Sequence, residues 1–142
     1  MSEDDTALRP DGQLAWMLAR VNQRFEDDLA KRLKPEGLAV EQFRILDALT
    51  RGGPAPMNTL AKVALVEPPT MTKIIDRMVA SGLVFRAPDD KDRRKIMIVM
   101  TDEGAALYDK LSTVSADQER QIELLLDGSK AQTLRNLLVS LI

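Results

Sequence analysis

The chain has 142 residues, of which 30% are charged, a net charge of −2, and neither cysteine nor histidine. This length suits one domain with a sizeable core. The composition excludes disulfides and thiolate chemistry, and it removes the commonest general base and the commonest transition-metal ligand. There is no run of about 18 apolar residues and the acidic N-terminus does not resemble a signal peptide, so we expect a cytoplasmic protein with no membrane partner.

The first predicted element is a long helix over residues 11–33. Apolar residues recur there every three or four positions, which is typical of one continuous helical stripe: Leu14, Leu18, Val21, Phe25, Leu29 and Leu33. A helix of this length spans about 33 Å. It needs an equally long partner, either within the chain or across a dimer.

A break at residues 35–37, Pro-Glu-Gly, precedes a second predicted helix over residues 38–50. Its apolar residues are Phe43, Ile45, Leu46 and Leu49. Residues 51–56 then form a connector rich in glycine and proline. A third helix is predicted over residues 57–65, with Asn58 as its N-cap.

A fourth helix is predicted from the Pro68-Pro69 pair to Ser81, because proline is tolerated in a first helical turn. Its two faces differ in composition. Met71, Ile74, Ile75, Met78 and Val79 share one face, whereas Pro69, Lys73, Asp76, Arg77 and Ala80 share the other. An ordinary amphipathic helix with a solvated outer face would show the same division.

The next segment reads as a β-hairpin. Gly82 ends the helix, residues 83–86 and 95–100 are predicted strands, and residues 87–94 form a charged tip. Two helices followed by a hairpin with a basic tip is the winged helix-turn-helix arrangement, in which one helix enters a major groove and the hairpin reaches a minor groove.

Charge distribution favours the same interpretation. Residues 62–95 hold eight basic and five acidic residues, a net charge of +3, so the rest of the chain carries −5. Local charge sets the field at a phosphate backbone. A solvated charged loop would also account for this charge.

Thr101 is a predicted N-cap, followed by acidic residues in the first turn of a helix that continues to Leu126. Residues 127–129 break it, and a last helix reaches the apolar end of the chain. Its apolar residues are Leu134, Leu137, Leu138, Leu141 and Ile142. We expect this surface to dock into a partner, although packing on the chain's own helices is the alternative.

The segments from Leu38 to Leu111 resemble, in order and spacing, the MarR family (multiple antibiotic resistance regulators) of bacterial winged-helix transcription regulators. The matching pieces are residues 38–46, 60–62, 72–78, 82–86, 92–94, 96–101 and Gly104. The most specific piece is Asp92-Arg93-Arg94. The flanking helices match the family only in length and position.

The resemblance implies a mainly α fold with a small β-hairpin wing, in one domain over residues 1–142. The winged-helix DNA-binding lobe covers residues 38–101. Long N- and C-terminal helices, residues 11–34 and 102–142, form the base of a homodimer. Family members bind pseudo-palindromic operators in double-stranded DNA, usually as repressors, and many release DNA when a small aromatic or anionic effector binds.

Residue by residue, the resemblance places Thr70, Thr72 and Lys73 at major-groove contact positions. Pro69 lies in the same first turn and is included in the DNA-binding set. Arg77, one turn further on, matches a phosphate contact. The tip residues Arg93 and Arg94 match the wing arginines, one of which enters the minor groove, while Asp92 is expected to structure the wing because phosphate would repel it.

An effector pocket between the dimer base and the lobe is also implied by the resemblance. Its candidate residues are Met17, Arg20, Phe25, Phe43, Arg44 and Leu46. Apolar residues at helical spacing are more often core than pocket. Arg20 is the most informative candidate, because a basic side chain can pair with a carboxylate.

Three features depart from the family pattern. Pro68 and Pro69 replace small hydroxyl residues and remove two amide donors. Ala39 replaces a capping threonine, which costs about 1 kcal/mol unless another group caps the helix. The absence of cysteine excludes a thiol switch, and the absence of histidine argues against zinc sensing.

Two other function classes compete with DNA binding. An enzyme is not expected, since the chain lacks a nucleophile motif and a phosphate-binding glycine loop, and we expect no cofactor and no metal. A dimeric winged-helix interaction module without DNA binding is the alternative. The retained Lys73, Arg77, Arg93 and Arg94 argue against it.

Overall fold

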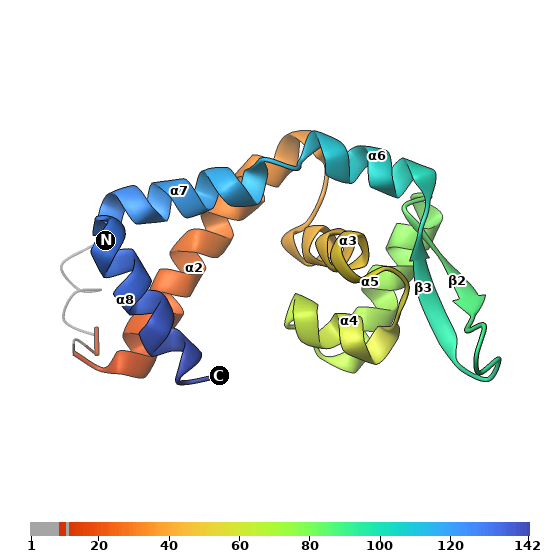
Figure 1. Ribbon diagram of the computed structural model, residues 1–142, viewed down its shortest axis with the longest axis horizontal. Coiled ribbons are helices and arrows are strands. Elements are labelled where there is room, and N and C mark those ends of the chain that lie inside the picture. The colour runs from red at the N-terminus through yellow and green to blue at the C-terminus, as the bar shows by residue number, and fades with distance from the viewer. Residues whose placement is uncertain (1–8, 11) are drawn as a thin grey trace.

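The computed structural model describes residues 9, 10 and 12–142. It is elongated, with an arm at one end and a lobe at the other, as Figure 1 shows. The arm consists of α2 (Leu14–Leu33), α7 (Val114–Leu126) and α8 (Gly128–Val139). The lobe consists of α3 (Val40–Gly52), α4 (Met57–Ala64), α5 (Pro68–Ala80) and a small sheet, and α6 (Asp102–Lys110) joins lobe to arm. The predicted fold class, mainly α with a hairpin wing, is confirmed.

The apolar stripe of α2 divides into two parts. Leu29 and Leu33 are buried near the lobe, whereas Leu14, at 76% exposure, and Leu18 are open to solvent. The predicted start near Asp11 lies outside the described residues, and the helix begins at Leu14. Only the C-terminal part of the stripe therefore packs within its own chain. A short 3-10 helix, η1 (Lys34–Glu36), then turns the chain into the lobe.

Helix α3 begins two residues later than predicted, after Ala39. The Gln42 side chain accepts the Ala39 amide N–H at 3.0 Å. Alanine has no side-chain acceptor, so only this half of a capping box exists. Gln42 therefore compensates in part for the missing threonine.

The predicted connector contains a two-residue strand, β1 (Ala55–Pro56), whose last residue is the N-cap of the next helix. Pro56 pairs with Met97 in the sheet, and α4 begins directly after it at Met57. The prediction that Asn58 is the N-cap is wrong for this reason. The Asn58 side chain accepts instead the amide N–H of Thr59 at 2.9 Å.

The sheet has three antiparallel strands in the order β1-β3-β2. Strands β2 (Val84–Pro88) and β3 (Ile96–Met100) form the predicted hairpin, with Arg86 opposite Ile98. Strand β2 runs two residues further than predicted. Thr101 caps α6 as expected, because its hydroxyl oxygen accepts the Gly104 amide N–H at 3.0 Å.

The predicted single helix from residue 102 to Leu126 is wrong, because a turn separates α6 from α7 at residues 111–113. Leu111 is buried in the core. Ser112 and Thr113 follow it and have low helix propensity, since their hydroxyls compete for backbone groups. The break at Asp127 between α7 and α8 is confirmed.

The core lies in the lobe. Its fully buried large side chains are Leu33, Ile45, Leu46, Leu60, Met71, Ile75, Met78, Val84 and Ile98. The core side chains of α7 and α8, by contrast, are few. Among the residues that the structure describes, no polar or charged side chain is buried. The lobe is therefore the well-packed unit, and the arm keeps much apolar surface exposed.

The described part of the chain contains no helix with the length and apolarity that a membrane crossing requires. It also contains no cluster of acidic side chains arranged to hold a metal ion.

Candidate nucleic-acid interface

Helix α5 presents two distinct faces to its surroundings. Met71, Ile75 and Met78 are fully buried against the lobe. The outer face is exposed, and its residues are Pro69, Thr70, Thr72, Lys73, Asp76 and Arg77. The predicted division is confirmed except at Val79, which is partly exposed. The outer face of α5 therefore offers two cationic side chains, Lys73 and Arg77, to a ligand.

The turn between α4 and α5 sets the direction in which α5 begins. Leu65 adopts a left-handed conformation with φ of 59°. The Val66 amide then donates to the Ala61 carbonyl at 3.0 Å, which closes α4. Glu67 is the N-cap position of α5, and Pro68 and Pro69 form its first turn.

The wing tip is a closed turn. The Lys95 amide donates to the Asp92 carbonyl at 2.9 Å, and the Asp89 amide donates to the Lys95 carbonyl at 2.8 Å. The Asp92 carboxylate accepts the Arg94 amide at 3.1 Å and lies 3.4 Å from Arg94 Nε. Asp92 thus orders the backbone that carries both wing arginines.

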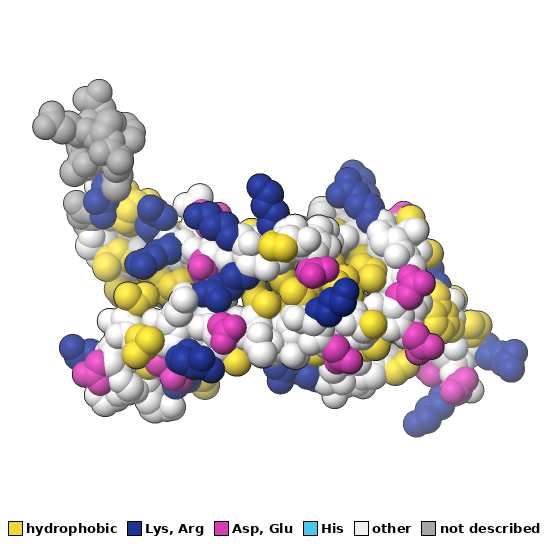
Figure 2. All heavy atoms as spheres, turned by 90° about the horizontal axis from the view of Figure 1, so that it is seen from above, with side chains coloured by type: hydrophobic (Ala, Val, Ile, Leu, Met, Phe, Trp, Pro, Cys, Tyr) yellow, Lys and Arg dark blue, Asp and Glu magenta, His cyan; other side chains and the backbone are white. Residues whose placement is uncertain are grey.

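Both tip arginines project into solvent. The Arg94 side chain is 93% exposed despite its contact with Asp92, and Arg93 is exposed beside it. Figure 2 shows Lys and Arg side chains extending from the end of the molecule that holds the wing. Lys91 and Lys95 are exposed on the same tip and were absent from the predicted set. Their position within the charged segment of residues 87–95 is the sequence feature that could have predicted them as candidates for DNA contact.

An ion pair joins α5 to the wing. Arg86 Nη2 of β2 lies 2.5 Å from Asp76 Oδ1 of α5. The pairing neutralises the one acidic side chain on the outer face of α5. Both groups are partly exposed, so the pair contributes little to stability. The sequence does not predict this contact, because no local pattern relates a helix residue to a strand residue ten positions later.

The six effector-pocket candidates are not brought together within one chain. Phe43 and Leu46 are buried in the lobe core, where they pack against neighbouring helices. Arg44 forms an ion pair with Glu26 of α2. Met17 and Arg20 are exposed on the first half of α2, which lies away from the lobe. Within one chain the side chains of Phe43 and Leu46 therefore fill the core, and a ligand pocket there stays a prediction.

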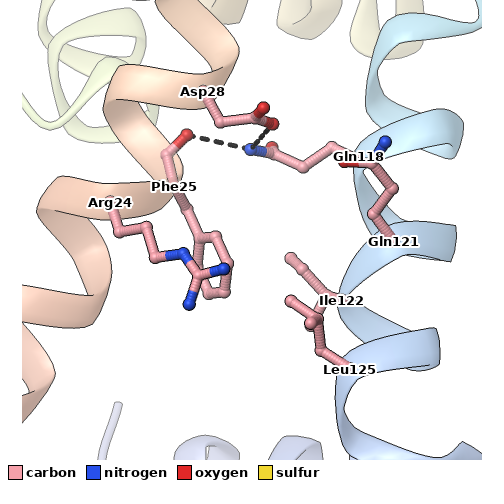
Figure 3. Close-up of a pocket in the computed structure, with 7 residues that line it drawn as sticks. All are labelled: Arg24, Phe25, Asp28, Gln118, Gln121, Ile122 and Leu125. Carbon is pink, nitrogen blue, oxygen red and sulfur yellow. Dashed lines mark hydrogen bonds between the residues drawn. The ribbon is translucent and has the colours of Figure 1, made fainter.

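Phe25 alone of the six lines a cavity between α2 and α7, shown in Figure 3. Gln118 Nε2 spans its upper end, donating to the Phe25 carbonyl at 2.9 Å and to Asp28 at 3.1 Å. The remaining lining residues are Arg24, Gln121, Ile122 and Leu125. Its volume is about 80 Å³. A cavity that accommodates benzene has roughly 150 Å³, so one chain does not supply room for an aromatic ligand there.

The joint between α3 and α6 contains the only tyrosine. The Tyr108 hydroxyl donates to the Asp47 carboxylate, and its ring stacks on Phe43 with centroids 6.0 Å apart. The hydrogen bond to Asp47, followed by partial burial, raises the pKa of Tyr108 above its usual value. This joint fixes α6, and therefore the path from lobe to arm.

Taken together, the helix pair α4–α5, the hairpin and its basic tip define a winged helix-turn-helix lobe. Comparison with known proteins supports this assignment of the lobe. A family model described as MarR family matches residues 36–95. The chain is 36% identical to the homoprotocatechuate degradative operon repressor of Escherichia coli over 106 residues, which cover 75% of this chain and 72% of that protein.

Two further relatives extend the match. The transcriptional repressor NicR of Pseudomonas putida is 32% identical, over 89% of this chain and 77% of its own. The structure of a mutant MarR from E. coli complexed with operator DNA superposes with a TM-score of 0.82 at 27% identity, covering 91% of this chain and 93% of that one. The chain belongs to the MarR family. It is a winged-helix transcription regulator and not an enzyme.

Proposed function

We propose that the protein is a homodimeric repressor that binds a pseudo-palindromic operator through α5 and the wing. The observation that carries the proposal is the outer face of α5. Lys73 and Arg77 are exposed there, and Arg86 neutralises the neighbouring Asp76. Between Pro68 and Ala80 the helix thus offers phosphate and base edges a surface whose single acid is paired, and the exposed Glu67 lies just before it at the N-cap.

Each candidate residue has a distinct role in this proposal. The first turn of α5, with Pro69, Thr70, Thr72 and Lys73, faces base edges in the major groove. Arg77 contacts phosphate. One of the two tip arginines enters a narrow minor groove, where negative potential is concentrated.

The arm supports a dimer. Exposed leucines and other apolar residues gather on α2, α7 and α8, at the left end of the molecule in Figure 2. A monomer would leave this surface in water at a large free-energy cost. We therefore assign residues 11–34 and 102–142 to dimerisation and residues 38–101 to DNA binding. A regulator of this kind acts on chromosomal DNA, so the proposal places it in the cytoplasm.

A small aromatic or anionic effector is part of the proposal. The E. coli relative is by name a homoprotocatechuate degradative operon repressor. The small cavity beside Phe25 lies next to the exposed first half of α2, which a second chain would cover in the dimer. A site completed by the partner chain would give the ligand the room that one chain lacks.

The test is binding to the intergenic duplex beside the protein's own gene against a scrambled duplex, titrated across salt concentration. We expect sequence-dependent binding with a steep salt slope. Arg93→Ala plus Arg94→Ala should weaken binding and reduce the log–log slope by roughly 0.9 for every phosphate that the wing no longer neutralises.

A matched control removes the same charge from the arm. Lys31→Ala plus Lys130→Ala affects two exposed side chains outside the lobe and should leave the slope unchanged. Equal slopes for the wing variant and the wild type would mean that the wing does not touch DNA. Absence of binding to either duplex at low salt would favour the interaction module.

A further inference from the structure

The first turn of α5 is poor in hydrogen-bond donors. Pro68 and Pro69 have no amide N–H, and the Met71 amide already donates to the Glu67 carbonyl at 3.0 Å. Among the backbone amides of Pro68 to Met71, only that of Thr70 remains for a ligand. Recognition by backbone donors is therefore largely removed from this turn.

The Thr72 hydroxyl is also turned inward. Its oxygen lies 3.4 Å from the Pro68 carbonyl oxygen and 3.7 Å from Met57 Sδ of α4. Both contacts draw the hydroxyl toward protein atoms. Threonine carries only a hydroxyl and a methyl group on its β-carbon, so the methyl group is the branch of this exposed side chain that makes no hydrogen bond.

A shallow groove runs beside this residue, between the first turns of α4 and α5. Its volume is about 220 Å³. Its lining is mostly apolar and consists of Met57, Asn58, Ala61, Pro68, Met71 and Thr72. Lys73 and Arg77 lie on the exposed face of the same helix, so a polyanion is attracted to the groove although its floor is apolar.

We infer that this apolar turn reads thymine through its C5 methyl group. The inference rests on the proposed function. The major-groove edges of the four bases carry a single apolar group, the thymine methyl, and apolar side chains recognise it. The methyl group of Thr72 and the rings of the two prolines supply the apolar contact. Lys73 remains the one side chain of this turn that donates strongly to a base edge.

The test uses a duplex that the protein itself selects from a random-sequence pool. Each thymine of that duplex is replaced in turn by deoxyuridine, which removes only the methyl group. At one or two thymines in each half-site we expect affinity to fall about four-fold. This is the fold-change that corresponds to the transfer free energy of one buried methyl group. The remaining thymines should tolerate the replacement.

Two substitutions separate methyl from hydroxyl recognition. Thr72→Val keeps the methyl group and should retain the discrimination between thymine and uracil. Thr72→Ser keeps the hydroxyl and should bind both duplexes equally. Thr133→Ser in α8 is the matched control, because the Thr133 hydroxyl makes the same type of backbone contact, 3.0 Å from the Ser129 carbonyl oxygen, outside the lobe.

The outcomes distinguish this inference from the proposed function. If no duplex is selected, the proposed function fails and the inference fails with it. If a duplex is selected but every uracil replacement is silent, the inference alone is overturned. Loss of discrimination in Thr72→Val with retention in Thr72→Ser would assign recognition to the hydroxyl and would also overturn it.

Discussion

Gly104 shows how a single residue couples the wing to α6. A β-carbon at this position would lie 2.3 Å from the Leu83 carbonyl oxygen and 2.9 Å from Met100 Cγ. The Leu83 carbonyl already accepts the Thr101 amide at 3.0 Å, so it is held in place. Glycine is needed here for close approach of two backbone segments and not for its torsion angles, since its φ is not positive.

Gly104→Ala should therefore destabilise the fold. We expect the free energy of unfolding to fall by about 1–3 kcal/mol, the usual cost of overpacking, as measured by urea denaturation. Gly128→Ala is the matched control, because nothing lies within 4 Å of its added β-carbon. Equal stability of the two variants would show that the backbone at Leu83 can move.

At the scale of elements, polar side chains add to the apolar packing that holds the lobe to the helices that leave it. Glu26 of α2 pairs with Arg44 of α3, and Tyr108 of α6 binds Asp47 of α3. Arg51 also contacts the Asp47 carboxylate at 2.9 Å. Helix α3 is thus the element on which both connections to the arm converge.

Tyr108→Phe removes the hydrogen bond to Asp47 and keeps the ring stacked on Phe43. We expect a loss of about 0.5–1.5 kcal/mol in the free energy of unfolding, typical of one hydrogen bond. Urea denaturation of the two proteins at neutral pH measures this difference. A variant as stable as the wild type would mean that water replaces Tyr108 as the partner of Asp47.

The hydrogen bond between Tyr108 and Asp47 also predicts that the free energy of unfolding depends on pH. The pKa of Tyr108 is raised in the folded protein by its hydrogen bond to Asp47. The stabilisation is therefore complete below the unfolded-state pKa and is lost as pH rises through the higher folded-state pKa. The stability difference between wild type and Tyr108→Phe should shrink in strongly alkaline buffer. A difference that is constant with pH would contradict this assignment.

For the whole molecule, the main question is what covers the arm. Its exposed apolar side chains lie on α2, α7 and α8, which Figure 1 shows at the same end of the molecule. In the proposed homodimer, a second copy with the same surface would cover it by two-fold symmetry. The two lobes would then be held at a fixed separation, as a palindromic site requires.

Leu137→Asp tests the dimer directly. This leucine is 60% exposed on α8 in the single chain, and a carboxylate there would be buried without a partner in the dimer. We expect light scattering at micromolar concentration to show a dimer for the wild type and a shift toward monomer for the variant. Leu65→Asp, a leucine 77% exposed on the lobe, should remain dimeric. A monomeric wild type would reject the dimer.

Most of the local structure could be read from residue order. The periodicity of α3 and α5, the glycine and proline breaks, the hairpin and the Thr101 cap depend on residues within a few positions of one another. The same is true of Asp92, which contacts Arg94 two residues away. The resemblance to the MarR family also rests on motifs that remain in order along the chain.

Long-range packing decided the rest. Burial of Leu111 separates α6 from α7, and pairing with Met97 of β3 makes Pro56, rather than Asn58, the N-cap of α4. Phe43 and Leu46 proved to be core, and Arg86 found Asp76 across the lobe. Helical spacing shows that a side chain shares a face with others, but not which element will cover that face. That depends on contacts between residues far apart in the chain, and these exist only once the elements have packed.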